Sequence, residues 1–198
     1  RVALYGGSFN PIHNGHVELL TLFTAELALD RCLLMPTATP PHKDAEGLVS
    51  AEHRYAMCKL AVRNMPKVQV SDIEIKRQGK SYTIDTLKAV HALYPKATLY
   101  LLMGADMFLS LHTWKNYRQI LQQAVVCTIP RNADDIEKLL AYEILLQNQG
   151  GKTYVINRQV TQVSSTQVRN AVKNGQDISP LVPKDVVNYI EENKLYRG

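Results

Sequence analysis

Two histidines near the start of the chain have the residue type and the spacing for phosphate chemistry. His13 and His16 belong to the run at residues 6–16, Gly-Gly-Ser-Phe-Asn-Pro-Ile-His-Asn-Gly-His, called here the N-terminal motif. They are three positions apart at a predicted helix start, so both imidazoles can face one phosphate-sized volume. Ring N–H groups can donate to phosphate oxygens, and Gly6 and Gly7 let the backbone come close to a ligand. The motif therefore predicts a phosphate site.

The histidine pair has two other interpretations. A lone histidine at such a position is typical of a helix cap or a surface side chain, but a pair in a glycine context favours ligand binding. The spacing could also suit a metal ion, which would need further ligands. Because the N-terminal motif holds no third Cys, His or carboxylate, we expect no metal bound by the protein itself.

A second polar run lies near the C-terminus. Residues 163–169, Val-Ser-Ser-Thr-Gln-Val-Arg, are called here the C-terminal motif. Hydroxyl groups at a helix start can cap the helix and can also donate to phosphate. Arg169 presents a planar fork suited to phosphate oxygens. Taken alone, this string is more typical of an ordinary helix N-cap followed by a solvated arginine.

Three segments in the middle of the chain carry further candidates. In the run 40–43, Pro-Pro-His-Lys, the prolines stiffen a loop and Lys43 can reach a polyphosphate as a point charge. The run 81–87, Ser-Tyr-Thr-Ile-Asp-Thr-Leu, puts hydroxyls and N–H groups at a helix start, which suits a small carboxylate or phosphate. Gly-Ala-Asp at 104–106 ends a strand, and Trp114 can stack on an aromatic ring. Alone, these are also typical of a solvated lysine, a capped helix and a core tryptophan.

The elements that position these groups alternate along the chain. Short apolar segments, typical of strands covered on both faces of a parallel sheet, occur at 2–5, 32–35, 99–103, 125–129 and 154–156. Helical stripes lie between them at 17–27, 84–94 and 136–144. The alternation predicts an α/β doubly wound sheet, in which ligands bind beyond the carboxyl ends of the strands.

The end of the chain has a different pattern. Two short helical stretches, 166–173 and 183–192, are separated by Gly175 and Pro180. Residues 164–198 therefore predict a small C-terminal helical appendage beside the ligand edge of the sheet. Because no Gly-, Ser- or Pro-rich linker divides the chain, we expect residues 1–198 to form a single domain.

Composition narrows the class of protein. A chain of 198 residues with 45% hydrophobic content can bury a sizeable core. The net charge of 23 − 18 = +5 comes from scattered side chains, which favours a small anionic substrate over nucleic acid. Without a run of about 20 apolar residues or a signal peptide, we expect a cytoplasmic protein that does not span a membrane. Cys32, Cys58 and Cys127 are expected to be reduced, partly buried thiols.

Both motifs resemble those of a known superfamily. The N-terminal motif resembles the signature of the nucleotidyltransferases with a Thr/His-x-Gly-His motif, and the C-terminal motif is similar to their Ile-Ser-Ser-Thr-x-x-Arg, with Val163 in place of Ile. The resemblance implies a Rossmann-like fold and nucleotidyl transfer, with the C-terminal motif on the β- and γ-phosphates of ATP and the histidines near the α-phosphate. Asn10 stands where the family often has Asp, which argues against a charged or metal-linked role and leaves amide hydrogen bonding open.

The middle segments resemble those of the bacterial nicotinate-nucleotide adenylyltransferase family, and the similarity extends from Val2 to Tyr196. The resemblance implies transfer of AMP from ATP to nicotinate mononucleotide in NAD biosynthesis, with Mg²⁺ held mainly by the ATP phosphates. The implied catalytic residues are His13, His16, Lys43 and Arg169. The implied ATP-binding residues are Gly6, Gly7, Ser8, Phe9, Gly104, Asp106, Ser164, Ser165 and Thr166, and the implied nicotinate-binding residues are Tyr82, Thr83 and Trp114.

Other functions remain to be distinguished. Phosphopantetheine adenylyltransferase shares both phosphate motifs but is typically shorter and lacks the Pro-Pro-His-Lys and Ser-Tyr-Thr-x-Asp-Thr segments. A non-catalytic nucleotide sensor would not need every phosphate-binding group, and a nucleic-acid-binding module would need a basic run or an aromatic-rich strand. The sequence leaves open the oligomeric state, the order of substrate addition and the degree of preference for nicotinate over nicotinamide mononucleotide.

Overall fold

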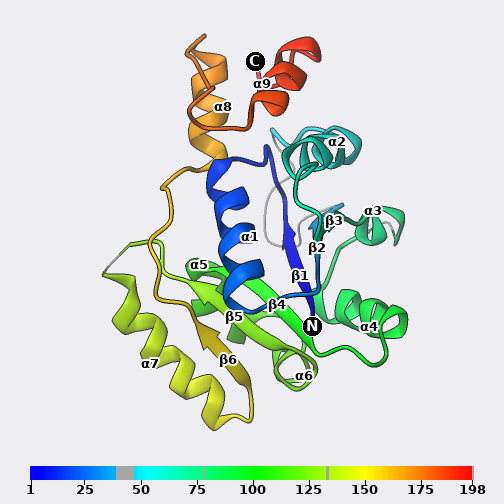
Figure 1. Cartoon of the computed structure of the whole chain (residues 1–198), viewed down its shortest axis with the longest axis vertical. Coiled ribbons are helices and arrows are strands. Elements are labelled where there is room, and N and C mark those ends of the chain that lie inside the picture. The colour runs from blue at the N-terminus through cyan, green and yellow to red at the C-terminus, as the bar shows by residue number, and fades with distance from the viewer. Residues whose placement is uncertain (39–46, 78, 133, 198) are drawn as a thin grey trace.

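The computed structural model of the chain describes residues 1–38, 47–77, 79–132 and 134–197. In these residues a six-stranded parallel sheet has the order β3-β2-β1-β4-β5-β6 (Figure 1). The strands are β1 (Val2–Gly7), β2 (Arg31–Pro36), β3 (Val68–Val70), β4 (Leu99–Gly104), β5 (Val125–Ile129) and β6 (Lys152–Val155). This order reverses between β1 and β4, which confirms the predicted doubly wound fold.

The central strand β1 is buried on both faces of the sheet. It pairs with β2 and β4, with Val2 opposite both Arg31 and Leu99. Its alternate residues enter different cores, because Ala3 and Tyr5 pack in one cluster and Val2 and Leu4 in the other. Burial on both faces explains why this segment is continuously apolar instead of alternating with polar residues.

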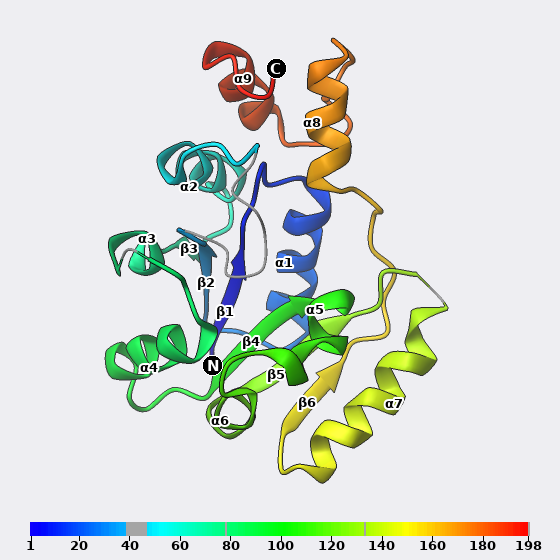
Figure 2. The ribbon, with the colours of Figure 1, turned by 180° about the vertical axis from the view of Figure 1, so that it is seen from behind.

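Helices cover both faces of the sheet (Figures 1 and 2). The core with Ala3 and Tyr5 also includes residues of α1 (Asn14–Glu26), α2 (Ala51–Ala61), α8 (Ser165–Lys173) and α9 (Lys184–Glu192). The core with Val2 and Leu4 includes residues of α4 (Thr83–Leu93), α5 (Ala105–Leu109), α6 (Tyr117–Gln123) and α7 (Asp135–Asn148). Two short elements, α3 (Ile73–Arg77) and the 3₁₀ turn η1 (Leu111–Thr113), lie in the connections.

The predicted C-terminal helices are present as α8 and α9, at the end of the molecule where α1 begins (Figure 1). The segment between them contacts the start of α1, because the backbone N–H of Asn14 donates to Leu181 O at 2.9 Å. An ion pair between Arg63 and Asp185, with a 2.6 Å N···O distance, joins α9 to the end of α2. The appendage thus lies beside the N-terminal motif, at the edge of the sheet where ligands are expected.

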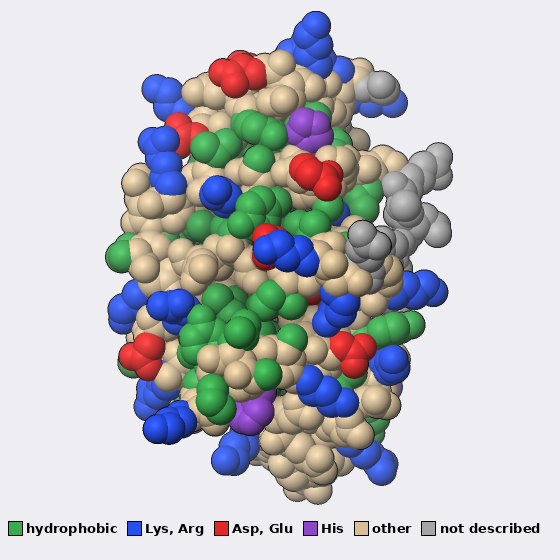
Figure 3. Space-filling view, turned by 90° about the vertical axis from the view of Figure 1, so that its right-hand side faces the viewer, with side chains coloured by type: hydrophobic (Ala, Val, Ile, Leu, Met, Phe, Trp, Pro, Cys, Tyr) green, Lys and Arg blue, Asp and Glu red, His purple; other side chains and the backbone are tan. Residues whose placement is uncertain are grey.

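The charged surface residues and the cysteine thiols are arranged as the composition predicts. On the face drawn in Figure 3, Lys and Arg side chains are spread out, with Asp and Glu among them. Cys32, Cys58 and Cys127 are buried and free, and burial raises the thiol pKa of Cys32 and of Cys127 to about 12. Among the described residues, no helix is both long and apolar enough to cross a membrane.

Candidate active site

The candidate site lies beyond the carboxyl ends of β1 and β4, the neighbouring strands at which the strand order reverses. The N-terminal motif leads from β1 into α1, and α5 begins directly after Gly104 at the end of β4. Connections at this point of an open α/β sheet diverge to opposite faces and leave a crevice for ligands. The fold therefore places both the histidines and the 104–106 segment at the ligand edge.

The structure brings His13 and His16 into direct contact. Their rings stack with centroids 3.6 Å apart. The backbone N–H of His13 donates to His16 Nδ1 at 3.3 Å, so in the neutral ring of His16 the proton is on Nε2. A main-chain hydrogen bond thereby selects the tautomer in which His16 is an N–H donor through Nε2.

The two histidines differ in their environment. His13 is only 6% exposed, and this burial lowers its pKa to about 4. Its imidazole is therefore neutral near pH 7. His16 is half-buried. His13 thus supports the stacked pair from the inside, and His16 is the more accessible of the two.

Gly15, between the histidines, is required by close packing. A Cβ at this position would lie 3.0 Å from the backbone oxygen of Thr161 and 3.2 Å from His13 Nδ1. A carbonyl oxygen of the backbone cannot move away easily, so a larger residue would displace the helix start or the ring. The glycine therefore preserves the stacked geometry.

Phe9 supports His16 from the interior. Its ring is buried and meets the ring of His16 nearly at right angles, with centroids 5.0 Å apart. Its backbone has φ 44°, a left-handed conformation that is uncommon for a residue with a side chain. A Cβ on Gly7 would lie 2.9 Å from the tip of this ring. Because the ring is buried, any contact of residue 9 with ATP would have to use its backbone.

The C-terminal motif is bonded to the N-terminal motif. Ser164 caps α8, because its side chain accepts from the N–H of Gln167 at 3.1 Å. Ser165 Oγ donates to the backbone oxygen of Pro11 at 2.8 Å. Arg169 donates from Nη1 to the backbone oxygen of Asn10 at 2.8 Å and from Nη2 to Thr166 Oγ1 at 3.1 Å. Hydroxyl and guanidinium groups are thus gathered at the start of α1.

The side-chain amide of Asn10 forms hydrogen bonds, a possibility that the sequence analysis left open. Its Nδ2 donates to the backbone oxygen of Gly47 at 2.9 Å, and its Oδ1 accepts from the N–H of Val49 at 3.2 Å. Its Oδ1 also accepts from the hydroxyl of Tyr196 at 2.9 Å. An ionised aspartate could accept these bonds but could not donate to Gly47. Residue 10 has a structural role here.

Arg54 is a buried residue of this region that the sequence analysis did not identify. It is 1% exposed and donates to the backbone oxygens of Val49, Ser8 and Ala38 at 3.1, 2.8 and 3.1 Å. Loss of hydration on burial lowers its pKa from the usual value for arginine. Its contacts hold the N-terminal motif against the residues that flank 39–46. Lys43, predicted to contact ATP, lies outside the described residues.

The candidate acceptor residues lie at the start of α4. Tyr82 is the N-cap residue, its side chain makes no capping hydrogen bond, and Thr83 is the first helical residue. Tyr82 and Trp114 are half-buried and pack on the same apolar cluster. The Nζ of Lys115, a residue that the sequence analysis did not single out, is 4.1 Å from the centre of the Tyr82 ring. A cation therefore accompanies the aromatic and N–H groups expected to contact the pyridine ring.

A buried carboxyl group braces the same helix. Thr86 in α4 donates from Oγ1 to Glu74 Oε1 at 2.8 Å and accepts from Arg77 at 2.9 Å. Burial raises the pKa of Glu74, although the hydrogen bond from Thr86 opposes this effect. These contacts fix α4 to α3, and they hold the start of α4 in place.

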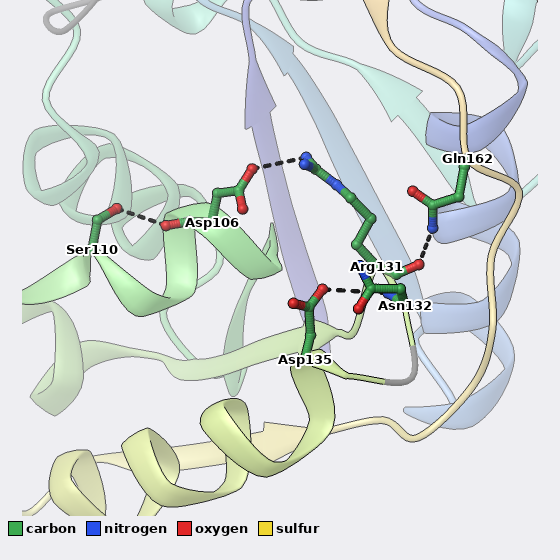
Figure 4. A network of polar contacts seen from close by, with 6 residues as sticks. All are labelled: Asp106, Ser110, Arg131, Asn132, Asp135 and Gln162. Atoms are coloured by element: carbon green, nitrogen blue, oxygen red, sulfur yellow. Dashed lines mark hydrogen bonds and ion pairs between the residues drawn. The ribbon is translucent and has the colours of Figure 1, made fainter.

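Asp106 is exposed in the first turn of α5 and forms an ion pair with Arg131, which follows β5 (Figure 4). The distance from Asp106 Oδ2 to Arg131 Nη2 is 2.8 Å, and the carbonyl of Arg131 accepts from the side chain of Gln162. Both charged groups are well exposed, so the pair contributes little to stability and a ligand can displace it. Within the described residues, no group of three or more His, Cys, Asp or Glu could hold a metal ion.

Comparisons with known proteins show the family to which the chain belongs. Residues 4–171 match the family model described as cytidylyltransferase-like. A probable nicotinate-nucleotide adenylyltransferase of Clostridium tetani (strain Massachusetts / E88) is 33% identical over 196 residues, which cover 98% of each chain. A protein of the same name from Desulfitobacterium hafniense (strain DSM 10664 / DCB-2) is 37% identical over 202 residues, covering 100% of this chain and 96% of that one.

A solved structure extends the similarity to the fold. The nicotinic acid mononucleotide adenylyltransferase of Plasmodium falciparum, complexed with NaAD, aligns with a TM-score of 0.79 and 20% identity. The alignment covers 98% of this chain and 96% of that one. Given the matching family model and the full-length relatives, this chain belongs to the nicotinate-nucleotide adenylyltransferase family, within the cytidylyltransferase-like proteins.

Proposed function

We propose that this protein transfers AMP from ATP to nicotinate mononucleotide, forming nicotinate adenine dinucleotide and pyrophosphate. The observation that carries the proposal is the bond from Arg169 to the backbone of Asn10, which joins the two phosphate motifs. Membership of the nicotinate-nucleotide adenylyltransferase family supports both the reaction and the acceptor.

The reaction is a direct in-line displacement. An oxygen of the 5′-phosphate of the mononucleotide attacks the α-phosphorus of ATP. The bond from that phosphorus to the oxygen bridging the β-phosphorus breaks, and this oxygen leaves with pyrophosphate. A phosphate monoester is largely dianionic at neutral pH, so no side-chain nucleophile is needed. Catalysis then depends on alignment and on stabilising the charge that develops.

His16 is the proposed donor to the α-phosphate. Its Nδ1 accepts a main-chain N–H, so the neutral ring carries its proton on Nε2. His13 and Phe9 hold this ring by stacking and edge contacts. A donor held in place before the substrate arrives stabilises developing charge without reorganisation during the reaction. His13 is proposed to contribute chiefly through this support, as a neutral ring.

Arg169 and the hydroxyls of the C-terminal motif are the proposed site for the β- and γ-phosphates. Two of the guanidinium's five N–H groups are directed to Asn10 and Thr166, and the others can bind phosphate oxygens. Lys43 is proposed to add a second cation from the 39–46 segment. Backbone groups of Gly6, Gly7 and Ser8 and the segment from Gly104 to Asp106 are proposed to contact the rest of ATP.

Magnesium is proposed to enter as part of the ATP substrate. Within the described residues, no cluster of His, Cys, Asp or Glu fits a resident metal. Mg²⁺ commonly keeps several waters and binds through substrate phosphates. The ATP phosphates and water can therefore supply most of its ligands. Neutralising phosphate charge is the chemistry that the ion would supply.

The acceptor is proposed to bind with its pyridine ring between Tyr82, Thr83 and Trp114. N–H groups at the start of α4 would receive the carboxylate, and Trp114 would stack on the ring. Lys115 adds positive charge beside Tyr82, which favours a carboxylate over a neutral amide.

Isotope labelling tests the reaction. With ATP labelled at the α-phosphorus, the label should enter the dinucleotide, and label at the γ-phosphorus should appear in pyrophosphate. If label from the γ-phosphorus entered the acceptor instead, the protein would be a kinase and the proposal would be wrong.

A further inference from the structure

The last residues of the chain reach back to the N-terminal motif. The hydroxyl of Tyr196 donates to Asn10 Oδ1 at 2.9 Å, a contact across 186 positions. Tyr196 is half-buried, and this burial raises the pKa of its phenol, so the group remains a donor at neutral pH. The end of the chain is therefore bonded directly to a residue of the candidate active site.

The preceding helix brings Tyr196 to this position. Its residue Tyr189 contacts His53 Nδ1 of α2 through its hydroxyl at 3.0 Å, and Leu195 is buried. Lys194 and Tyr196 have φ 52° and 63°, left-handed conformations that are costly for residues with side chains. Such conformations persist where the surroundings determine the backbone strongly, and they are often found at functional sites.

Asn10 also contacts two other parts of the site. It is 6% exposed, and its Oδ1 also accepts from the N–H of Val49. Its backbone oxygen accepts from Arg169, the proposed ligand of the ATP phosphates. A change in the orientation of Asn10 would therefore alter the carbonyl that holds the Arg169 guanidinium.

We propose that Tyr196 is a positioning residue for ATP, acting through Asn10 on the guanidinium of Arg169. The inference rests on the proposed function, because it assigns Arg169 to the ATP phosphates. Without the hydroxyl, Asn10 keeps its bonds to Gly47 and Val49 but loses one of its three side-chain hydrogen bonds, and a smaller fraction of the protein holds Arg169 in its binding geometry. The apparent affinity for ATP falls by that fraction.

Two matched substitutions test the proposal. Tyr196→Phe and Tyr189→Phe each remove one phenol hydroxyl from the same C-terminal segment, but only the first contacts Asn10. We expect Tyr196→Phe to raise the KM for ATP about fivefold to tenfold, the size expected for one net hydrogen bond, with little change in the KM for nicotinate mononucleotide. Tyr189→Phe should leave both KM values unchanged. Equal effects of the two variants, or no effect of Tyr196→Phe, would overturn the proposal.

A double-mutant cycle tests the route through Asn10. In an Asn10→Ala background, Tyr196→Phe should cause no further change in the KM for ATP, because its acceptor is already absent. Full additivity would contradict the route. Binding of ATP measured by calorimetry separates this inference from the proposed function. If the wild-type protein binds ATP but forms no dinucleotide, the function is wrong, and the effect of Tyr196→Phe on ATP affinity still decides the role of Tyr196.

Discussion

The guanidinium of Arg169 is bonded to the backbone oxygen of Asn10 at 2.8 Å, across 159 positions of the chain. The N-terminal and C-terminal motifs are therefore connected before a nucleotide binds. If Arg169 binds phosphate as proposed, folding already meets part of the entropic cost of orienting its guanidinium. This relationship makes Arg169 the first residue to test.

Replacing Arg169 should impair the use of ATP even when the charge is kept. Arg169→Lys loses the planar fork and so cannot hold Asn10 and Thr166 together while it binds phosphate. We expect kcat/KM for ATP to fall about tenfold or more in Arg169→Lys and further in Arg169→Ala, measured by steady-state kinetics. Lys173→Ala, an exposed cation on the same helix, is the control. Unchanged constants in both Arg169 variants would remove this residue from the ATP site.

Replacing His16 should slow the chemical step more than it weakens ATP binding. Its proposed donor matters most when charge develops at the α-phosphate, and loss of one such donor typically lowers the rate about 10²–10³-fold. Single-turnover kinetics of His16→Ala, with circular dichroism to verify folding, would measure this. A folded variant with a near-normal single-turnover rate would contradict the role given to His16.

Burial of His13 predicts a loss of stability in acid. Its pKa is about 4 in the folded protein and about 6.5 in an unfolded chain, so between these values the unfolded state binds more protons. The free energy of unfolding should therefore fall as the pH falls from 6.5 to 4, and His13 should account for at most about 3 kcal/mol of this loss. Above pH 6.5, His13 should make the free energy of unfolding no more dependent on pH. Glu74 has the opposite effect on the pH dependence of the free energy of unfolding, because its raised pKa stabilises the folded state in acid.

Comparing His13→Gln with the wild type isolates the histidine from Glu74. Urea unfolding at pH 7.5 and pH 4.5 should give a smaller difference between the two pH values in His13→Gln than in the wild type. An identical pH dependence in the two proteins would show that His13 is not held neutral by the fold.

Lys115 should help to distinguish a carboxylate from an amide. Its Nζ lies over the ring of Tyr82, beside the start of α4. We expect Lys115→Met to lower kcat/KM for nicotinate mononucleotide about threefold to tenfold, leave the value for nicotinamide mononucleotide nearly unchanged, and reduce the salt dependence of the preference. Lys88→Met, on the exposed side of α4, is the control. Equal losses with both acceptors would refute the charge argument.

Strands buried on both faces and a glycine-rich turn before a helix could be predicted because each leaves a local pattern. Segment 125–129 is observed with the predicted bounds, because four of its five residues are apolar and only Thr128 is polar. The three-residue strand β3 was missed, since Val68 and Val70 are only half-buried and its central Gln69 is exposed. Helix α2 was missed as well, because its buried positions include Arg54.

The supporting residues of the site could not be predicted, because long-range contacts give them their roles. Arg54 has no local feature that indicates burial, and its acceptors at Ser8 and Ala38 come from other segments. Tyr196 is equally ordinary in sequence until the fold places it against Asn10. By contrast, His13, His16 and Arg169 could be proposed as site residues from the sequence, because the spacing of chemical groups within each motif is local.

Pyrophosphate release with ATP and three acceptors, measured in parallel, tests the central claim most directly. The acceptors are nicotinate mononucleotide, nicotinamide mononucleotide and phosphopantetheine. A site of N–H donors and a lysine matches both carboxylate oxygens, whereas an amide leaves one contact unmatched, at a cost of about 1–3 kcal/mol. We predict that kcat/KM is highest for nicotinate mononucleotide, about tenfold or more above nicotinamide mononucleotide, with no release above background from phosphopantetheine. Preference for phosphopantetheine, or no pyrophosphate with either pyridine nucleotide, would contradict the claim.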